Sequence, residues 1–278
     1  MTTPITTTWD GNAMSQDDMM MKDTVLVLDA TDGIIGSASK KDSHVFSSNQ
    51  PRGVLHRAFS VFLFDESNGK LLLQQRASTK ITFPNVWTNT CCSHPLHGME
   101  PSEVDVSCAD GKVLGVKHAA IRKLDHELGI PPSELDIAKF QFLTRLWYWA
   151  ADTVTHGTAS PWGEHEIDYV LFYTIPNKDA LTINGHEDEV DAVKWVSPTE
   201  LQTMLSDSKQ YLFSPWFRLI VQKWMLGDDG WWTNLEESMS ATSKYKDYTT
   251  IHRFDPPDEH LGGAGKAGKQ FADQNEDK

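Results

Sequence analysis

The stretch VLGVKHAAIRKLDHEL, residues 113–128, predicts one amphipathic helix in the middle of the chain. Its apolar residues recur at the spacing of a single helix face: Val113, Val116, Ala120, Leu124 and Leu128. Gly129 follows directly, and Pro131 and Pro132 come next, which is the usual way for a helix to end. Because one apolar face must be buried against another element, we expect a sheet to pack on this helix.

Segments on both sides of the helix predict the strands of that sheet. Residues 56–64 and 70–75 have the pattern of a β-hairpin, joined by a turn that ends in Gly69. Further elements are expected as strands at 139–149, 166–175 and 191–196, and as helices at 198–205 and 215–226. Strands placed around one strong central helix predict a compact sandwich of the α/β (α+β) class.

The composition is that of a globular enzyme. The chain has 278 residues, 39% of them hydrophobic, which is enough to bury a core. A net charge of -14 argues against nonspecific nucleic-acid binding, and no apolar run approaches the roughly 20 residues needed to span a membrane. Nothing at the N-terminus resembles a secretory signal. We therefore expect a cytoplasmic monomer with no nucleic-acid or membrane partner.

The two ends of the chain differ from its middle. Residues 1–22 are rich in Thr, Asp and Met without a sustained periodicity, and residues 253–278 are rich in Gly, Lys and Asp. Such segments bury too little apolar surface to order themselves. We expect one domain at 23–252 with a flexible extension at each end.

Two short segments carry side chains that are suited to acid–base chemistry. One is NTCCSHP, residues 89–95, and the other is WGEHE, residues 162–166. Cys91 and Cys92 are adjacent and rarely bridge each other in this arrangement, while Cys108 leaves an odd count, so we expect reduced thiols. A thiol, imidazoles and carboxylates together are sufficient for proton transfer on a small molecule.

The carboxylates of the second segment suggest a metal site. If residues 164–168 are extended, Glu164 and Glu166 point to one face and His165 to the other. Two neighbouring carboxylates repel each other unless a cation lies between them, and His44, His56 and His94 are available to complete such a site for Zn²⁺, Mn²⁺ or Mg²⁺. The alternatives are a solvated acidic edge and histidines that serve only the surface or the core.

Seven short motifs occur in order between residues 40 and 252: KKxxH (40–44), LHRAFS (55–60), QRA (75–77), TNTCCSHP (88–95), HELG (126–129), EHE (164–166) and SPWF (214–217). In this order they resemble the type I isopentenyl-diphosphate isomerases, and in particular the fungal branch. The resemblance implies a Nudix-like α/β/α sandwich with a mixed sheet, a divalent metal, and interconversion of isopentenyl and dimethylallyl diphosphate in isoprenoid biosynthesis.

The Nudix signature itself is incomplete in this sequence. Arg122 and Glu127 match it, whereas Leu114, Lys123 and His126 stand where three of its glutamates belong. Those glutamates bind the metal that activates water, so hydrolysis is disfavoured. Two alternatives remain open: a Nudix-type pyrophosphohydrolase, and a noncatalytic binding module that is stabilised by a metal.

The resemblance implies four catalytic residues. Cys92 and Glu166 match an acid–base pair on opposite sides of a planar allylic skeleton, where one protonates the alkene and the other removes a proton two carbons away. Trp216 matches an indole that faces the developing cation, and a desolvated π face contributes about 2 kcal/mol. Tyr148 matches a tyrosine that hydrogen-bonds near the catalytic carboxylate.

The resemblance also implies a metal set and a diphosphate site. The metal ligands that carry over are His44, His56, His94, Glu164 and Glu166. Glu127 matches a carboxylate that helps to hold a Mg²⁺ bridging to the diphosphate. Contacts with the small-molecule diphosphate carry over to Lys40, Arg76, Lys80, Lys123 and Ser93. Because the net charge is -14, an anionic substrate needs such a local basic site.

Overall fold

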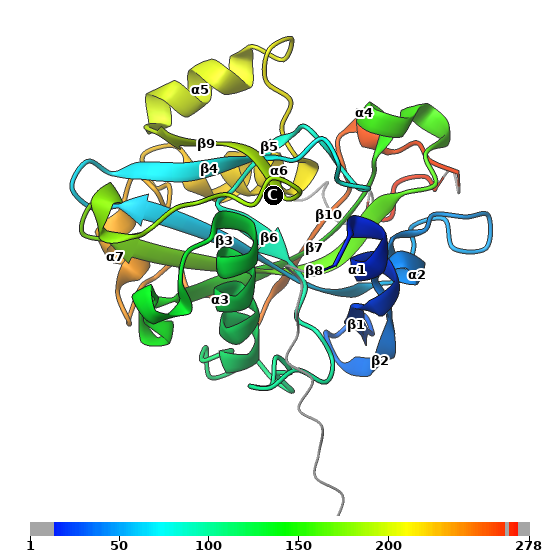
Figure 1. Cartoon of the computed structure of the whole chain (residues 1–278), viewed down its shortest axis with the longest axis horizontal. Helices are drawn as coiled ribbons and strands as arrows, with labels where there is room; N and C mark the ends of the chain where they lie inside the picture. Colours follow the sequence, from blue (N-terminus) through cyan, green and yellow to red (C-terminus); the bar gives the residue numbers. More distant parts are fainter. Residues whose placement is uncertain (1–13, 265–266, 272–278) are drawn as a thin grey trace, which may run out of the picture.

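A mixed sheet forms the centre of the molecule (Figure 1). The computed structural model describes residues 14–264 and 267–271. Within them the strands are β1 (Thr24–Leu28), β2 (Ile34–Ser39), β3 (His56–Asp65), β4 (Lys70–Arg76), β5 (Trp87–Thr88), β6 (Cys91–Ser93), β7 (Gln141–Ala151), β8 (Gly163–Ile175), β9 (Val190–Val196) and β10 (Ile251–Phe254). Their main order is β10-β7-β8-β3-β1-β2. Strand β3 runs parallel to β8, whereas β7 is antiparallel to β8, so the mixed sheet is confirmed.

The helices are short except for one. They are α1 (Gln16–Lys22), α2 (Lys40–His44), α3 (Leu114–Leu128), α4 (Thr153–His156), α5 (Pro198–Ser206), α6 (Pro215–Ile220) and α7 (Leu235–Met239). Helix α3 is the predicted central helix, and Gly129 ends it in the left-handed conformation with φ 61°. A π-helical turn at Val221–Met225 continues α6, so the helix expected at 215–226 is split.

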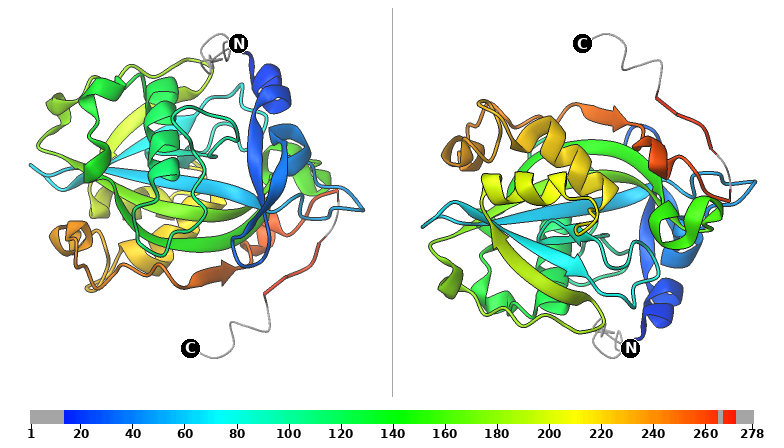
Figure 2. Two further views of the ribbon diagram at one scale, coloured as in Figure 1. Left: turned by 90° about the horizontal axis from the view of Figure 1, so that it is seen from below. Right: turned by 90° about the horizontal axis from the view of Figure 1, so that it is seen from above.

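Helices α3 and α6 cover opposite faces of the sheet (Figure 2). Alternation along β3 explains this arrangement, because successive side chains point to opposite faces. Phe59, Val61 and Leu63 belong to the core cluster under α3, whereas Phe62 and Phe64 belong to the cluster that contains Trp216, Phe217 and Ile220 of α6. The expected sandwich is therefore confirmed, with one hydrophobic core on each side of the sheet.

The sheet divides near the site. Strands β3 and β4 pair at Phe64–Leu71 and Asp65–Lys70, directly beside the hairpin turn. Further along, β6 pairs with β3, while β5 and β9 pair with β4. Residues 58–60 of β3 and Arg76 at the end of β4 line one pocket, to which α3 and α6 also contribute side chains.

Both ends of the chain differ from the expected flexible extensions in the residues that the structure describes. Helix α1 is capped by Ser15 and buries Met19 and Met20. Near the other end, Phe271 is buried and its ring lies against Trp147. Residues 1–13, 265–266 and 272–278 lie outside the described residues, and the domain bounds at 23 and 252 stay a prediction. In the described part of the chain, none of the helices has the length and apolar character to cross a membrane.

Candidate active site and metal centre

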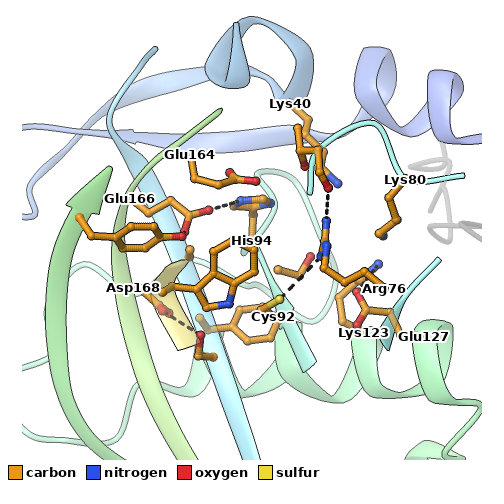
Figure 3. A pocket seen from close by; sticks show the side chains of 17 residues that line it. Lys40, Arg76, Lys80, Cys92, His94, Lys123, Glu127, Glu164, Glu166 and Asp168 are labelled. Atoms are coloured by element: carbon orange, nitrogen blue, oxygen red, sulfur yellow. Dashed lines mark hydrogen bonds and ion pairs between the residues drawn. The ribbon is translucent and has the colours of Figure 1, made fainter. Parts of the chain in front are cut away.

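One pocket brings together nearly all of the predicted site residues (Figure 3). The pocket and the solvent space at its mouth together amount to about 430 Å³. Its lining includes Lys40, Ser60, Arg76, Lys80, Cys92, Ser93, His94, Lys123, Glu127, Tyr148, Glu164, Glu166, Asp168 and Trp216. These residues come from α2, β3, β4, β6, α3, β7, β8 and α6, together with the loops that follow β4 and β6. Only the tertiary fold can assemble them.

Alternation along β8 directs the carboxylates into the pocket. Glu164, Glu166 and Asp168 line it, whereas the Nε2 atom of His165 accepts a hydrogen bond from the Trp147 indole at 2.9 Å. The strand register adds the neighbours, since His56 lies beside Glu166 on one side and Tyr148 lies beside it on the other. The predicted split of the GEHE segment between two faces of the sheet is therefore confirmed.

Three histidines and two carboxylates converge at one end of this pocket. One ligand atom from each member of the cluster lies within 4.8 Å of those of all the others: His44, His56, His94, Glu164 and Glu166. The imidazole ring centroids are 4.8 to 5.0 Å apart. The Nε2 atom of His94 lies 2.8 Å from Glu166 Oε1, and the Nε2 atom of His44 lies 2.7 Å from Glu164 Oε2.

The cluster fits a divalent cation. The Nδ1 atoms of His44 and His56 lie 2.6 and 2.7 Å from the backbone carbonyls of Lys40 and Val54, so these nitrogens carry the hydrogens. The Nε2 atoms then present lone pairs to the cluster. Nε2 of both histidines and Oε2 of Glu164 are buried without a hydrogen bond of good geometry. Burial holds the pKa of His94 well below its usual value, which favours the neutral ring that a metal ion binds.

Cys92 and Cys91 point to opposite faces of β6. Cys92 lies opposite Ser60 of β3 and lines the pocket, while Cys91 lies opposite Val61 and belongs to the core under α3. The Sγ atom of Cys92 is 3.8 Å from Nη1 of Arg76. Burial raises the pKa of the Cys92 thiol to about 12, against the opposing effect of Arg76, so the group is a thiol in this structure.

Glu166 connects the cluster with the rest of the pocket. Its Oε2 atom accepts a hydrogen bond from the Tyr148 hydroxyl, and its Oε1 atom faces His94. Burial acts to raise the pKa of Glu166, but the contacts with His56 and Tyr148 outweigh this effect and lower the pKa. The carboxylate is therefore held in one position by groups on three different strands or loops.

Basic side chains form the other end of the pocket. Figure 3 shows Arg76, Lys80 and Lys123 to the right of Cys92 and Glu166 to its left, with Lys40 above them on the right-hand side. The backbone carbonyls of Phe83 and Thr82 hold the Arg76 guanidinium at 2.9 and 2.8 Å. Burial, with a smaller contribution from the charges of Lys80 and Lys123, lowers the pKa of Lys40 to about 8. This end is built to receive an anion with several oxygen atoms.

Ser93 and Glu127 line the same pocket, and Glu127 lies beside Lys123. Ser93 lines the pocket next to Cys92. Glu127 also lines it, accepts a hydrogen bond from Gln74 Nε2 at 2.9 Å, and lies 3.3 Å from Lys123 Nζ. The structure does not bring Glu127 into the five-residue cluster, so any cation that it helps to hold is a separate one.

Trp216 closes the pocket from α6. Its side chain is 3% exposed, and its indole Nε1 atom donates a hydrogen bond to Asn89 Oδ1 at 3.2 Å. The ring of Phe83 meets it edge-on at 5.4 Å, and the Tyr148 ring lies 6.2 Å away. These contacts fix the plane of the indole beside Arg76, whose guanidinium lies 5.8 Å from the ring centre.

Asp168 and Ser60 line the pocket and Asn89 contacts Trp216, although no sequence motif gave these side chains a site role. Asp168 lines the pocket and accepts a hydrogen bond from the Ser60 hydroxyl at 2.8 Å. Continuing the alternation of Glu164 and Glu166 by two residues would have found Asp168. Asn89 belonged to a quoted motif, but its contact with Trp216 depends on the placement of α6 and has no sequence signal.

A divalent cation should stabilise this protein against heat. At a free concentration of one hundred times Kd, binding to the folded state adds about 2.7 kcal/mol to the free energy of unfolding, because the unfolded chain lacks the converged cluster. The measurement is Tm of chelator-treated protein with and without added Mg²⁺, Mn²⁺ or Zn²⁺. We expect His56→Asn to lose this increase in Tm and His165→Asn, on the opposite face of β8, to keep it. Equal increases in the two variants would contradict the assignment.

Comparison with known proteins gives one consistent family. The model of the NUDIX domain matches residues 54–217. The isopentenyl-diphosphate delta-isomerase of Aspergillus fumigatus is 46% identical over 242 residues, which cover 84% of this chain and 79% of that protein. The enzyme of the same name from Schizosaccharomyces pombe is 45% identical, with 84% and 92% covered. Isopentenyl-diphosphate Delta-isomerase 1 of Mesocricetus auratus is 40% identical, with 86% and 95% covered.

Proposed function

The chain belongs to the isopentenyl-diphosphate delta-isomerase family of NUDIX-domain proteins, and from this we propose that it interconverts isopentenyl and dimethylallyl diphosphate. The reaction moves a double bond by one carbon. A proton is added to the terminal CH₂ carbon, which becomes a methyl group, and a proton is lost from the CH₂ carbon on the other side of the central carbon. The enzyme therefore needs two proton-transfer groups and a binding site for a diphosphate.

The observation that carries the proposal is one pocket with two chemically different ends. Glu166 belongs to the cluster at one end, four cations line the opposite side, and Cys92 lies between Glu166 and Arg76. A substrate whose diphosphate lies among Lys40, Arg76 and Lys80 places its five-carbon chain between the thiol and the carboxylate. We propose that these two groups act on opposite sides of the planar allylic skeleton, one donating a proton while the other accepts one.

Tyr148 and Trp216 complete the catalytic set in this proposal. The Tyr148 hydroxyl hydrogen-bonds to Glu166 and fixes the oxygen that exchanges a proton. A simple alkene is a weak base, so the tertiary cation that develops on protonation needs stabilisation where water is excluded. The buried indole of Trp216 supplies a π face beside the substrate, and Ser93 is a further polar contact next to Cys92.

We propose that the five-residue cluster binds a divalent cation, with Mg²⁺ as the first candidate and Mn²⁺ or Zn²⁺ as alternatives. A bound cation supplies positive charge beside Glu166, which orients this carboxylate and sets its proton affinity. His44, His56, His94 and Glu164 are the other ligands of that site. In the same proposal Glu127 would help to hold a second Mg²⁺, which would supply positive charge to the bound diphosphate.

A NUDIX-type pyrophosphohydrolase is the alternative function. The contacts of α3 disfavour it, because Lys123 occupies one signature position and pairs with Glu127 at 3.3 Å. His126, at another, lies 2.8 Å from Lys123 Nζ. Incubating the protein with isopentenyl diphosphate, and separately with nucleoside diphosphate derivatives, tests both functions. Dimethylallyl diphosphate without phosphate release supports the isomerase, and phosphate release without isomerisation supports the hydrolase.

Trp216 should show its role through a graded pair of substitutions. We expect Trp216→Phe to keep part of the isomerase activity and Trp216→Ala to lose most of it, since a phenyl ring retains part of the π stabilisation and alanine retains none. The measurement is kcat for isopentenyl diphosphate in variants whose folding is checked by circular dichroism. Near-wild-type kcat in both folded variants would remove Trp216 from the proposed stabilisation of the cation.

The cellular setting is part of the same proposal. The family acts on small diphosphates, and we propose a cytoplasmic monomer that serves isoprenoid biosynthesis through the mevalonate pathway, including the supply of sterol precursors. The oligomeric state is testable by light scattering of the purified protein. The location is testable by fluorescence of a tagged full-length chain.

A further inference from the structure

Glu189 lies behind the basic end of the pocket, directly before β9, and does not line the pocket itself. Its Oε2 atom accepts a hydrogen bond from Lys80 Nζ and lies 3.5 Å from Lys123 Nζ. Its Oε1 atom accepts a hydrogen bond from Gln16 Nε2 of α1 at 2.6 Å. One carboxylate thus contacts two of the four basic side chains that would meet the diphosphate.

The backbone of Glu189 also supports the loop that carries Lys80. Its carbonyl accepts a hydrogen bond from Ala77 N at 3.0 Å, and the carbonyl of Ala77 accepts one from Lys80 N at 3.1 Å. Lys80 is therefore fixed at both ends, through its backbone by the Ala77 turn and through its ammonium group by the Glu189 carboxylate. Residue 189 sets the direction in which this lysine enters the pocket.

Because Lys80 and Lys123 are buried, their positive charges need a nearby negative charge. Lys80 is 8% exposed, Lys123 is 4% exposed and Glu189 is 1% exposed. Buried ammonium groups that lie close together neutralise or separate unless an anion compensates them. Burial acts to raise the pKa of Glu189, but Lys123 and Lys80 outweigh it and hold that pKa well below its usual value. The carboxylate is thus a permanent negative charge behind the lysines.

We propose that Glu189 is a positioning residue for the diphosphate: from behind the pocket its carboxylate holds the Lys80 and Lys123 side chains and directs them at one place. The inference rests on the proposed function and deepens it. The Lys80 ammonium group has three N–H donors, so its contact with Glu189 leaves donors for the substrate. Lys123 also lies near Glu127 and His126, so it contributes mainly its positive charge. If Glu189 instead competed with the diphosphate for the lysines, its removal would tighten binding of the diphosphate. The two roles therefore predict changes in diphosphate affinity of opposite sign.

The test compares Glu189→Gln with Glu187→Gln. Both changes remove one negative charge, but Glu187 is exposed and two residues away. We expect Glu189→Gln to raise KM for isopentenyl diphosphate by at least about tenfold and to raise Ki for inorganic pyrophosphate in parallel. The reason is that removing one partner of a buried charge pair leaves the other partner, here the lysines, without the charge that positions it. We expect kcat to change by less than about threefold, and Glu187→Gln to match the wild type in all three constants.

Glu189→Asp keeps the inference testable if Glu189→Gln does not fold. This variant retains the charge but withdraws the carboxylate by one CH₂ group. We expect its KM to exceed the wild-type KM by about threefold or more, and to stay below the KM of Glu189→Gln where that variant folds. An unchanged or lower KM in the folded variants, or a fall in kcat with KM unchanged, would overturn the positioning role. If the wild type itself does not isomerise the substrate, the proposed function fails instead, so the two failures are distinguishable.

Discussion

Replacing Cys92 with alanine should lower the rate of isomerisation by a factor of about 10² to 10⁴, the usual contribution of one acid–base group. The physical reason is local. Cys92 is the thiol of β6 that lines the pocket, and alanine can neither donate nor accept a proton there. Hydrogen exchange between solvent and substrate should fall with the rate. The measurements are kcat for isopentenyl diphosphate and deuterium uptake from D₂O, followed by NMR.

Cys91→Ala is the matched control for this prediction. The two cysteines are adjacent, but Cys91 belongs to the core under α3 and not to the pocket. We expect this variant to lose some thermal stability through the cavity it leaves and to keep both its turnover and its deuterium uptake. The cation-dependent increase in Tm should survive in both variants. Normal turnover by Cys92→Ala, or loss of activity in folded Cys91→Ala alone, would show that the proposed proton-transfer pair is wrong.

Glu166→Gln should lose isomerisation to a similar or larger extent. Glu166 has two roles in the proposal, since it belongs to the metal cluster and is also the second proton-transfer group. Glutamine has nearly the same shape but cannot exchange a proton at the position that the Tyr148 hydroxyl holds. We therefore expect a loss of at least about 10² in kcat that added cation does not restore.

Glu164→Gln separates the two roles of Glu166. Glu164 lies in the same cluster and lines the same pocket, but in the proposal it is only a ligand. Its replacement should weaken cation binding, and activity should recover as the concentration of Mg²⁺ or Mn²⁺ is raised. Titrating both variants with each cation at saturating substrate gives the comparison. Recovery of Glu166→Gln to the wild-type kcat would reduce Glu166 to a ligand.

The parts of the fold that were predictable are those with local periodicity. Helix α3 and the β3–β4 hairpin follow from the spacing of apolar residues and from Gly69 and Gly129. Helix α1 has seven residues and β6 has three, which is too short for either to be stable alone. They form because they pack on or pair with distant elements, so sequence periodicity could not reveal them.

The candidate site likewise has one part that follows from local sequence and another that only the tertiary fold produces. The common direction of Glu164 and Glu166 follows from the alternation of one strand, and the structure has this arrangement. Their convergence with three histidines depends on the parallel register of β3 and β8, in which His56 lies beside Glu166. No local sequence pattern predicts that register. Glu189 was missed for the same reason, since its contacts with Lys80 and Lys123 join segments that are far apart in sequence.

The most direct test of the central claim is a short incubation of the wild-type protein with isopentenyl diphosphate and Mg²⁺ in D₂O, followed by NMR. If proton transfer by two groups on opposite sides of the substrate is correct, the first product formed is dimethylallyl diphosphate with one deuterium in its new methyl group and no released phosphate. Dimethylallyl diphosphate without deuterium, or inorganic phosphate in place of the isomer, would contradict the account.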